Sequence, residues 1–201
     1  MPDYDIYYNI GSFMLGTAIV SCNDIVLMNI NKLPSGRPIA VEYRGLHILN
    51  IYAPSGAGAR TEGEYFDNAE LPQLQQTGHG EFIIGGDINF VTTPADTSGN
   101  FHTSRTLKEI LGGLHLTDTW RQAPTRPAYT HYSTTGDSRI HRIYITSNIA
   151  SRITGFDLLS AGFTDQNTVV FYSAMGKMGA RRRHPRWKFD HAVLQDAELL
   201  N

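Results

Sequence analysis

A carboxylate and an amide two residues apart, Asp87 and Asn89, are the side chains of this sequence best suited to chemistry. They follow Phe82–Ile84, an apolar run typical of a strand buried in the middle of a sheet, and then Gly85-Gly86, which permits a sharp turn. In extended backbone, residues two apart point to the same side. One group could activate water while the other holds a substrate oxygen, as in metal-assisted hydrolysis. Taken alone, the stretch favours an ordinary Gly-Gly-Asp turn.

The composition restricts the class of protein. The chain has 201 residues, of which 41% are hydrophobic and 18% charged, so it is long and apolar enough to fold around one core. The net charge of −2 gives no overall basic field, and any contact with nucleic acid must come from a local patch. The single cysteine, Cys22, excludes an internal disulfide framework and fits a reducing compartment. No apolar run has membrane-spanning length, and the acidic start does not resemble a signal peptide.

The elements that must position Asp87 and Asn89 are predicted to form an α/β layered sandwich. Two helices are expected, one over residues 61–76 and one capped by Thr103 or Ser104 and ending at Leu111. A hairpin is expected around Arg44-Gly45, because this break between two apolar runs is very short. Strands are expected at residues 15–20, 25–30, 39–43, 46–51, 82–84, 129–132, 138–146, 153–159 and 168–172.

The tail over residues 177–188 is basic and contains no acid. Its arginines include Arg181, Arg182 and Arg183. Such a cluster is compatible either with a solvated linker at the end of a domain or with a contact to nucleic acid.

Four stretches of the sequence follow one another in an order that allows comparison with a known superfamily. They are Asn50–Pro54, Gly85–Asn89, Ser138–Tyr144 and Gly162–Gln166. Together they resemble the endonuclease/exonuclease/phosphatase (DNase I-like) superfamily, and most closely the endonuclease domain of insect LINE-type (non-LTR) retrotransposons. The resemblance implies a sandwich of two mainly antiparallel β-sheets flanked by helices. The tail, with Trp187-Lys188 in it, is similar to the linker that follows this domain, so residues 1–174 are expected to form the domain and 175–201 a basic extension.

The resemblance also implies an activity, which is Mg²⁺-dependent hydrolysis of a DNA phosphodiester by an in-line water. In that scheme Asp87 activates the water, Asn89 holds it with a phosphate oxygen, and Tyr52 donates to the phosphate. Asp165 is expected near the metal, and these residues should share one cleft. DNA contacts are expected from Thr130, Arg139 and the tail arginines Arg181, Arg182 and Arg183. An intracellular, nuclear location and no membrane partner follow by analogy.

Three departures from the family pattern bear on activity. An N-terminal strand–helix–strand unit is expected to be missing, and with it the metal-binding Glu. His141 stands where the family has an Asp, and Gln166 stands where it has the catalytic histidine. A neutral amide can donate a hydrogen bond but carries no proton to the phosphate. Because residues that act as a unit fail together, we expect a catalytically impaired domain.

Three alternatives stay open. Asp190-His191 is a tempting acid–histidine pair, but it follows the linker-like Trp187-Lys188, so His191 is expected outside the cleft. The chain could still be an active Mg²⁺-dependent endonuclease completed by missing residues or by a partner. It could also be a non-catalytic nucleic-acid-binding remnant. A phosphoesterase acting on lipids or inositol phosphates is disfavoured by the retrotransposon-like tail.

Overall fold

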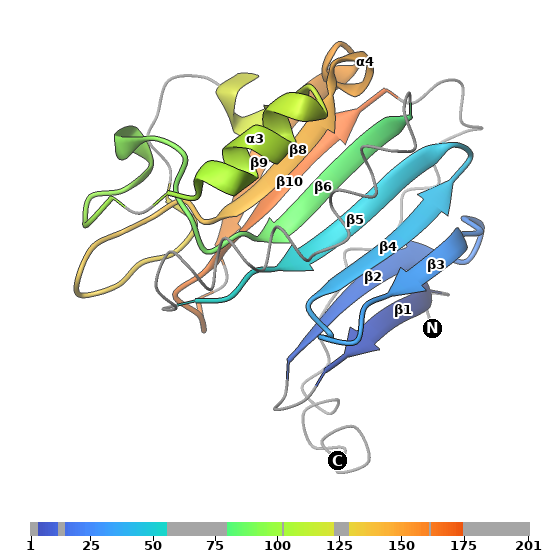
Figure 1. The fold of residues 1–201 in the computed structure, drawn as a ribbon, viewed down its shortest axis with the longest axis horizontal. Coiled ribbons are helices and arrows are strands. Elements are labelled where there is room, and N and C mark those ends of the chain that lie inside the picture. Colours follow the sequence, from blue (N-terminus) through green and yellow to red (C-terminus); the bar gives the residue numbers. More distant parts are fainter. Residues whose placement is uncertain are drawn as a thin grey trace.

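The computed structural model describes residues 4–11, 15–55, 80–101, 103–122, 129–160 and 162–174. The helix expected at 61–76 and the extension at 175–201 lie outside these residues, as do Arg181, Arg182, Arg183 and His191. Within the described residues, the chain forms a six-stranded mixed sheet and two two-stranded sheets with few helices, which confirms the predicted α/β sandwich (Figure 1). No helix in this part of the chain is long and apolar enough to cross a membrane.

The central sheet carries Asp87 at the end of one of its inner strands. In spatial order its strands are β3 (Met28–Lys32), β4 (Pro38–Tyr43), β5 (Leu46–Tyr52), β6 (Glu81–Asp87), β8 (His141–Thr146) and β7 (Leu116–Asp118). Strands β5 and β6 run parallel, and the other neighbours are antiparallel. The hairpin predicted at Arg44-Gly45 joins β4 to β5, and both turn residues have positive φ, of 50° and 81°.

One face of this sheet is covered by helix α3 (Arg105–Gly113) (Figure 1). Leu107, Ile110 and Leu111 of α3 pack against alternate residues of β5 and β6, such as Leu49 and Ile84. The predicted cap is confirmed, because the Ser104 hydroxyl accepts a hydrogen bond from the Leu107 N–H at 3.1 Å. Three short helical segments complete the described helices, and they are η1 (Pro94–Asp96), η2 (Thr119–Gln122) and α4 (Ser147–Ala150).

The opposite face carries the two small sheets. Strands β1 (Tyr4–Ile10) and β2 (Gly16–Cys22) form one antiparallel pair, and β2 contacts β4 and β5. Strands β9 (Ile153–Ser160) and β10 (Asn167–Ser173) form the other, and β10 contacts β8. The two pairs therefore cover opposite ends of the central sheet (Figure 1). Between β2 and β10, part of the back of β5 and β6 is left for a cavity.

Several predicted boundaries were wrong. The strand expected over 138–146 begins only at His141, because the Ser138 and Arg139 N–H groups donate to the carbonyls of His131 and Asp96 in neighbouring loops. The run expected at 129–132 forms only an isolated bridge at His131. The strand expected at 25–30 is displaced to β3, whose pairing is irregular and whose Asn29 has a φ of 49°. The sequence analysis did not predict β1 or β7.

Candidate functional site

Three of the predicted site residues lie side by side in the central sheet, at the ends of three neighbouring inner strands. The strand register pairs Asp87 of β6 with Tyr52 of β5 on one side and with His141 of β8 on the other. Gly86 makes this arrangement possible, because its φ is +131° and a Cβ there would lie 2.0 Å from the Ile51 carbonyl oxygen. Gly86 thus lets β5 approach β6 closely directly before the acid.

The Asp87–Asn89 turn is clamped to the chain that follows Tyr52. The Asn89 N–H donates to Asp87 Oδ1 at 2.9 Å, and Asn89 has a φ of 55°. Its side-chain Nδ2 donates to the Ala53 carbonyl at 2.7 Å, and the Ala53 N–H donates to the Asp87 carbonyl at 2.8 Å. The Asn89 amide therefore fixes two loops to one another and uses one of its two N–H donors to do so.

His141 faces the carboxylate of Asp87. Its Nε2 lies 3.8 Å from Asp87 Oδ2, and both side chains are largely buried, with 17% and 20% exposure. Its ring is oriented by a 3.2 Å contact between Nδ1 and the Thr130 carbonyl oxygen. Burial raises the pKa of the Asp87 carboxyl, while His141, the Asn89 N–H and His131 act in the opposite direction. The site therefore holds a carboxylate that takes up a proton more readily than an exposed aspartate.

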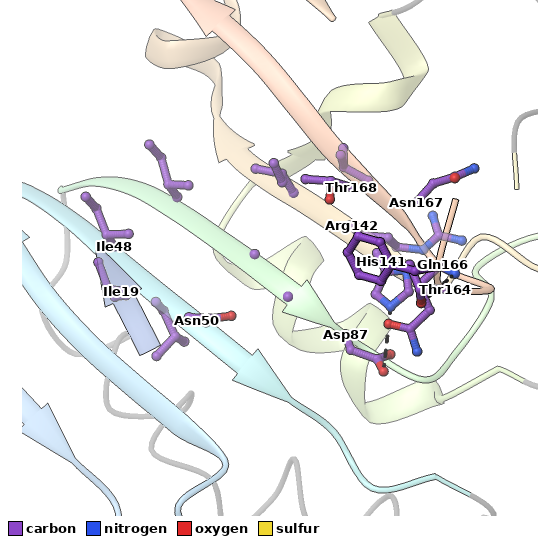
Figure 2. A pocket seen from close by; sticks show the side chains of 17 residues that line it. Ile19, Ile48, Asn50, Asp87, His141, Arg142, Thr164, Gln166, Asn167 and Thr168 are labelled. Carbon is purple, nitrogen blue, oxygen red and sulfur yellow. Dashed lines mark hydrogen bonds and ion pairs between the residues drawn. The ribbon is translucent and has the colours of Figure 1, made fainter. Parts of the chain in front are cut away.

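A cavity of about 560 Å³ opens beside this pair, on the back of β5 and β6 between the two small sheets. Asp87, His141 and Gln166 line it, and Figure 2 shows His141 and Gln166 together on one side of the Asp87 carboxylate. The apolar part of the lining includes Ile19, Ile48, Ile83, Ile143 and Val169. Further polar lining residues are Asn50, Arg142, Thr164, Asn167 and Thr168. The cavity combines a polar end, where the chemistry-bearing groups gather, with an aliphatic floor.

Three other predicted residues lie around the cavity without lining it. Tyr52 is next to Asp87 in the sheet, and the Arg37 guanidinium lies 5.0 Å from the centre of its ring. Asn89 belongs to the clamped turn described above. Asp165 has a 61% exposed side chain, and its Oδ2 lies 3.7 Å from Nε2 of His131. His131, which the sequence analysis did not select, forms a β-bridge with Gln166 and thereby places Asp165 near the site.

Two residues predicted to contact DNA are not available to do so. Thr130 is fully buried, and its hydroxyl accepts the backbone N–H groups of Ile140 and His141 at 3.1 and 3.0 Å. Arg139 is 4% exposed and donates to the carboxylates of Asp96 and Asp118. The same observation speaks against both predictions, since the polar groups of these side chains are already bound inside the protein.

The donor set does not match the predicted magnesium site. Within the described residues, no three His, Cys, Asp or Glu side chains are grouped closely enough to hold a metal ion. Asp87 faces His141, and Asp165 faces His131, so each carboxylate has one histidine and no second acid. Mg²⁺ prefers oxygen ligands in near-octahedral geometry, and these residues alone do not offer them.

Comparisons with known proteins show what this chain is similar to. No family model matches the chain. The "Transposon TX1 uncharacterized 149 kDa protein" of Xenopus laevis is 27% identical over 161 residues, which cover 76% of this chain and 12% of the frog protein. The chain thus spans only a small part of that relative.

Solved structures are similar over most of the chain. An AP endonuclease from Archaeoglobus fulgidus superimposes with a TM-score of 0.72 at 20% identity, covering 85% of this chain and 79% of the other. The 3′ phosphatase NExo from Neisseria, bound to product DNA hairpin, gives 0.72 with the same identity and coverage. The 3′-5′ exonuclease NExo from Neisseria meningitidis gives 0.70, also at 20% identity. The chain therefore has the DNase I-like endonuclease/exonuclease/phosphatase fold and is distantly similar to a segment of a transposon protein.

Proposed function

We propose that this chain is an endonuclease/exonuclease/phosphatase-type domain of LINE retrotransposon origin that binds DNA and is impaired in phosphodiester hydrolysis. The observation that carries the proposal is the arrangement around Asp87. The cavity wall there holds His141 and Gln166, where the resemblance expects an aspartate and a histidine. The fold and the distant transposon relative support the origin, and the DNA-bound neighbour supports DNA as the ligand. A nuclear location follows from that ligand.

The described residues can perform part of the hydrolysis. Asp87 can accept a proton from an attacking water, and the neighbouring Tyr52 hydroxyl can donate to a phosphate oxygen. The Gln166 amide can donate a hydrogen bond but cannot supply a proton to the leaving oxygen. The Mg²⁺ expected from the resemblance would add charge neutralisation, yet the residues near Asp87 do not fit such a site. The described residues near Asp87 therefore offer groups for binding and positioning and do not supply the charge compensation.

A second candidate is an active endonuclease whose site is completed by further chain or by a partner. The observation that favours it is the cavity itself, which lies on the back of β5 and β6 between β2 and β10 and opens beside Asp87. A segment placed there could bring a carboxylate to the site. A third candidate, the non-catalytic binding remnant, rests on the basic tail and keeps DNA binding without chemistry.

A nicking assay separates these candidates. Supercoiled plasmid would be incubated with the 201-residue chain and Mg²⁺, with EDTA and the Asp87→Ala variant as blanks. The exposed acid Asp157 offers a matched control, Asp157→Ala. We expect no nicking above the Asp87→Ala blank, together with salt-sensitive DNA binding measured by fluorescence anisotropy. EDTA-sensitive nicking that Asp87→Ala abolishes and Asp157→Ala leaves intact would establish the active enzyme instead.

A further inference from the structure

The tautomer of His141 is fixed by its neighbours. Nδ1 lies 3.2 Å from the carbonyl oxygen of Thr130, and the His141 backbone N–H is bound to the Thr130 hydroxyl at 3.0 Å. A carbonyl oxygen can only accept a hydrogen bond, so Nδ1 must carry a hydrogen to make this contact. In a neutral imidazole, Nε2 is then the nitrogen without a hydrogen.

That bare nitrogen would face a carboxylate oxygen. Nε2 lies 3.8 Å from Asp87 Oδ2, while the other oxygen, Oδ1, accepts the Asn89 N–H. Two lone pairs at this separation in a largely buried site repel one another. The contact is favourable only when a proton lies on Nε2 or on Asp87 Oδ2, and the buried carboxyl of Asp87 has a raised pKa.

The other charged groups around the pair are already bound. Arg142 follows His141 on β8 and lines the cavity, but its guanidinium is bound to Asp96 and Asp118. His131 lies close enough to act on Asp87, and its own partner is Asp165. From the β10 side the pair meets Gln166, a neutral amide.

We propose that the Asp87–His141 pair holds one proton at neutral pH, and that the pair donates this proton in a hydrogen bond to an oxygen of a phosphate group in the cavity. The proposal deepens the proposed function, because the phosphate in question is that of DNA. An imidazolium Nε2–H is a charge-assisted donor to an anionic oxygen. The pair itself carries no net charge in this state, so an anionic ligand meets no repulsion from Asp87. No covalent step is involved.

Nitrogen-15 NMR of the histidine rings tests whether the pair holds this proton, and it does not depend on catalysis. His141 signals would be assigned by their loss in His141→Gln protein. At pH 7 we expect Nε2 of the wild-type protein to show the nitrogen-15 chemical shift of a protonated ring nitrogen. In the Asp87→Asn variant we expect the chemical shift of an unprotonated Nε2, with the hydrogen on Nδ1. A neutral ring protonated on Nε2, or a wild-type spectrum unchanged by Asp87→Asn, would overturn the proposal.

Phosphate binding forms the second arm of the experiment. Inorganic phosphate and an oligonucleotide with a terminal phosphate would be titrated separately while the backbone amide signals of the protein are followed, a readout that every variant retains. We expect His141→Gln to weaken the binding of both by about tenfold or more, the loss typical of one charged hydrogen bond. His115, an exposed residue with a φ of 52° at the end of α3, supplies the control His115→Asn, which should bind normally. Equal binding by His141→Gln and wild type would refute the binding role, whatever the nicking assay shows.

Discussion

Arg139 and Arg142 bind the same two carboxylates. Arg139 donates to Asp96 Oδ1 at 2.7 Å and to Asp118 Oδ2 at 2.8 Å, and Arg142 reaches Asp96 Oδ2 at 2.9 Å and Asp118 Oδ2 at 2.6 Å. None of these four side chains is more than 8% exposed. This buried ion network joins η1, β7 and the start of β8, and it thereby holds the chain that carries His141 opposite the end of β6.

Breaking the network should destabilise the fold. Replacing Arg142 by Leu leaves Arg139 as the buried cation that binds both Asp96 and Asp118, and losing one partner of a buried pair costs about 3–5 kcal/mol. Urea unfolding followed by circular dichroism should show a lower midpoint with an unchanged slope. Arg105→Ala, which removes an exposed ion pair with Glu109, should leave the midpoint where it is. An Arg142→Leu protein as stable as wild type would mean that the network contributes nothing.

The same network predicts the response to acid. Burial alone would raise the pKa of Asp96, but Arg142 and Arg139 outweigh it and hold that pKa far below the usual range. Because the folded-state pKa is depressed, this contribution to stability is complete above about pH 4, the ordinary pKa of an aspartate, and is lost as the pH falls further. Urea midpoints at pH 7, 5, 4 and 3 should decline mainly over the last step, from pH 4 to pH 3. The Asp96→Asn protein should be less stable than wild type at pH 7, and its urea midpoint should decline less steeply as the pH falls. A decline parallel to that of wild type would contradict the assignment of the acid response to Asp96.

Gly86→Ala should abolish folding. An added Cβ would lie 2.0 Å from the Ile51 carbonyl oxygen, and the φ of +131° is strained for any side chain. The parallel pairing of β5 with β6 would have to open. Gly112 in α3 has nothing within 4 Å of its added Cβ, so Gly112→Ala should raise stability by roughly 0.5–1 kcal/mol. Thermal melts should show a higher midpoint for Gly112→Ala and no cooperative transition for Gly86→Ala, and a cooperative wild-type-like melt of Gly86→Ala would be inconsistent with this geometry.

Restoring the family-like pair should not restore cleavage. His141→Asp with Gln166→His would place an acid beside a histidine, yet neither change supplies the metal-binding Glu of the family pattern. Plasmid nicking by the double variant should stay at the level of its Asp87→Ala derivative. Adding an N-terminal strand–helix–strand segment with its Glu should produce Mg²⁺-dependent nicking only in this repaired background. Cleavage by the double variant alone would show that Asp87 and Asp165 suffice.

Much of the scaffold was readable from the sequence because the signals were local. The hairpin at Arg44-Gly45 and the cap at Ser104 depend on a few neighbouring residues, and both are confirmed. The position of Asp87 at the end of a strand was equally local, since two glycines and an apolar run precede it.

Contacts distant in sequence were not readable in this way. Arg139 resembled a surface cation because its partners, Asp96 and Asp118, are 43 and 21 residues away and meet it only in the folded sheet. Thr130 has a polar side chain in a loop. Nothing nearby in the sequence showed that its hydroxyl would accept the backbone N–H groups of Ile140 and His141. His131 became relevant only through its bridge to Gln166.

The buried ion network also changes how the stretch Ser138–Tyr144, which contains Arg139 and Arg142, can be interpreted in evolution. Selection for a foldable chain is enough to preserve Arg139 and Arg142 together with their two acids, even in a lineage where cleavage has been lost. Counts of matching signature residues would then overestimate how many such domains are enzymes. A library intended to recover activity should therefore hold these four positions constant and diversify positions 87, 141 and 166, whose side chains line the cavity.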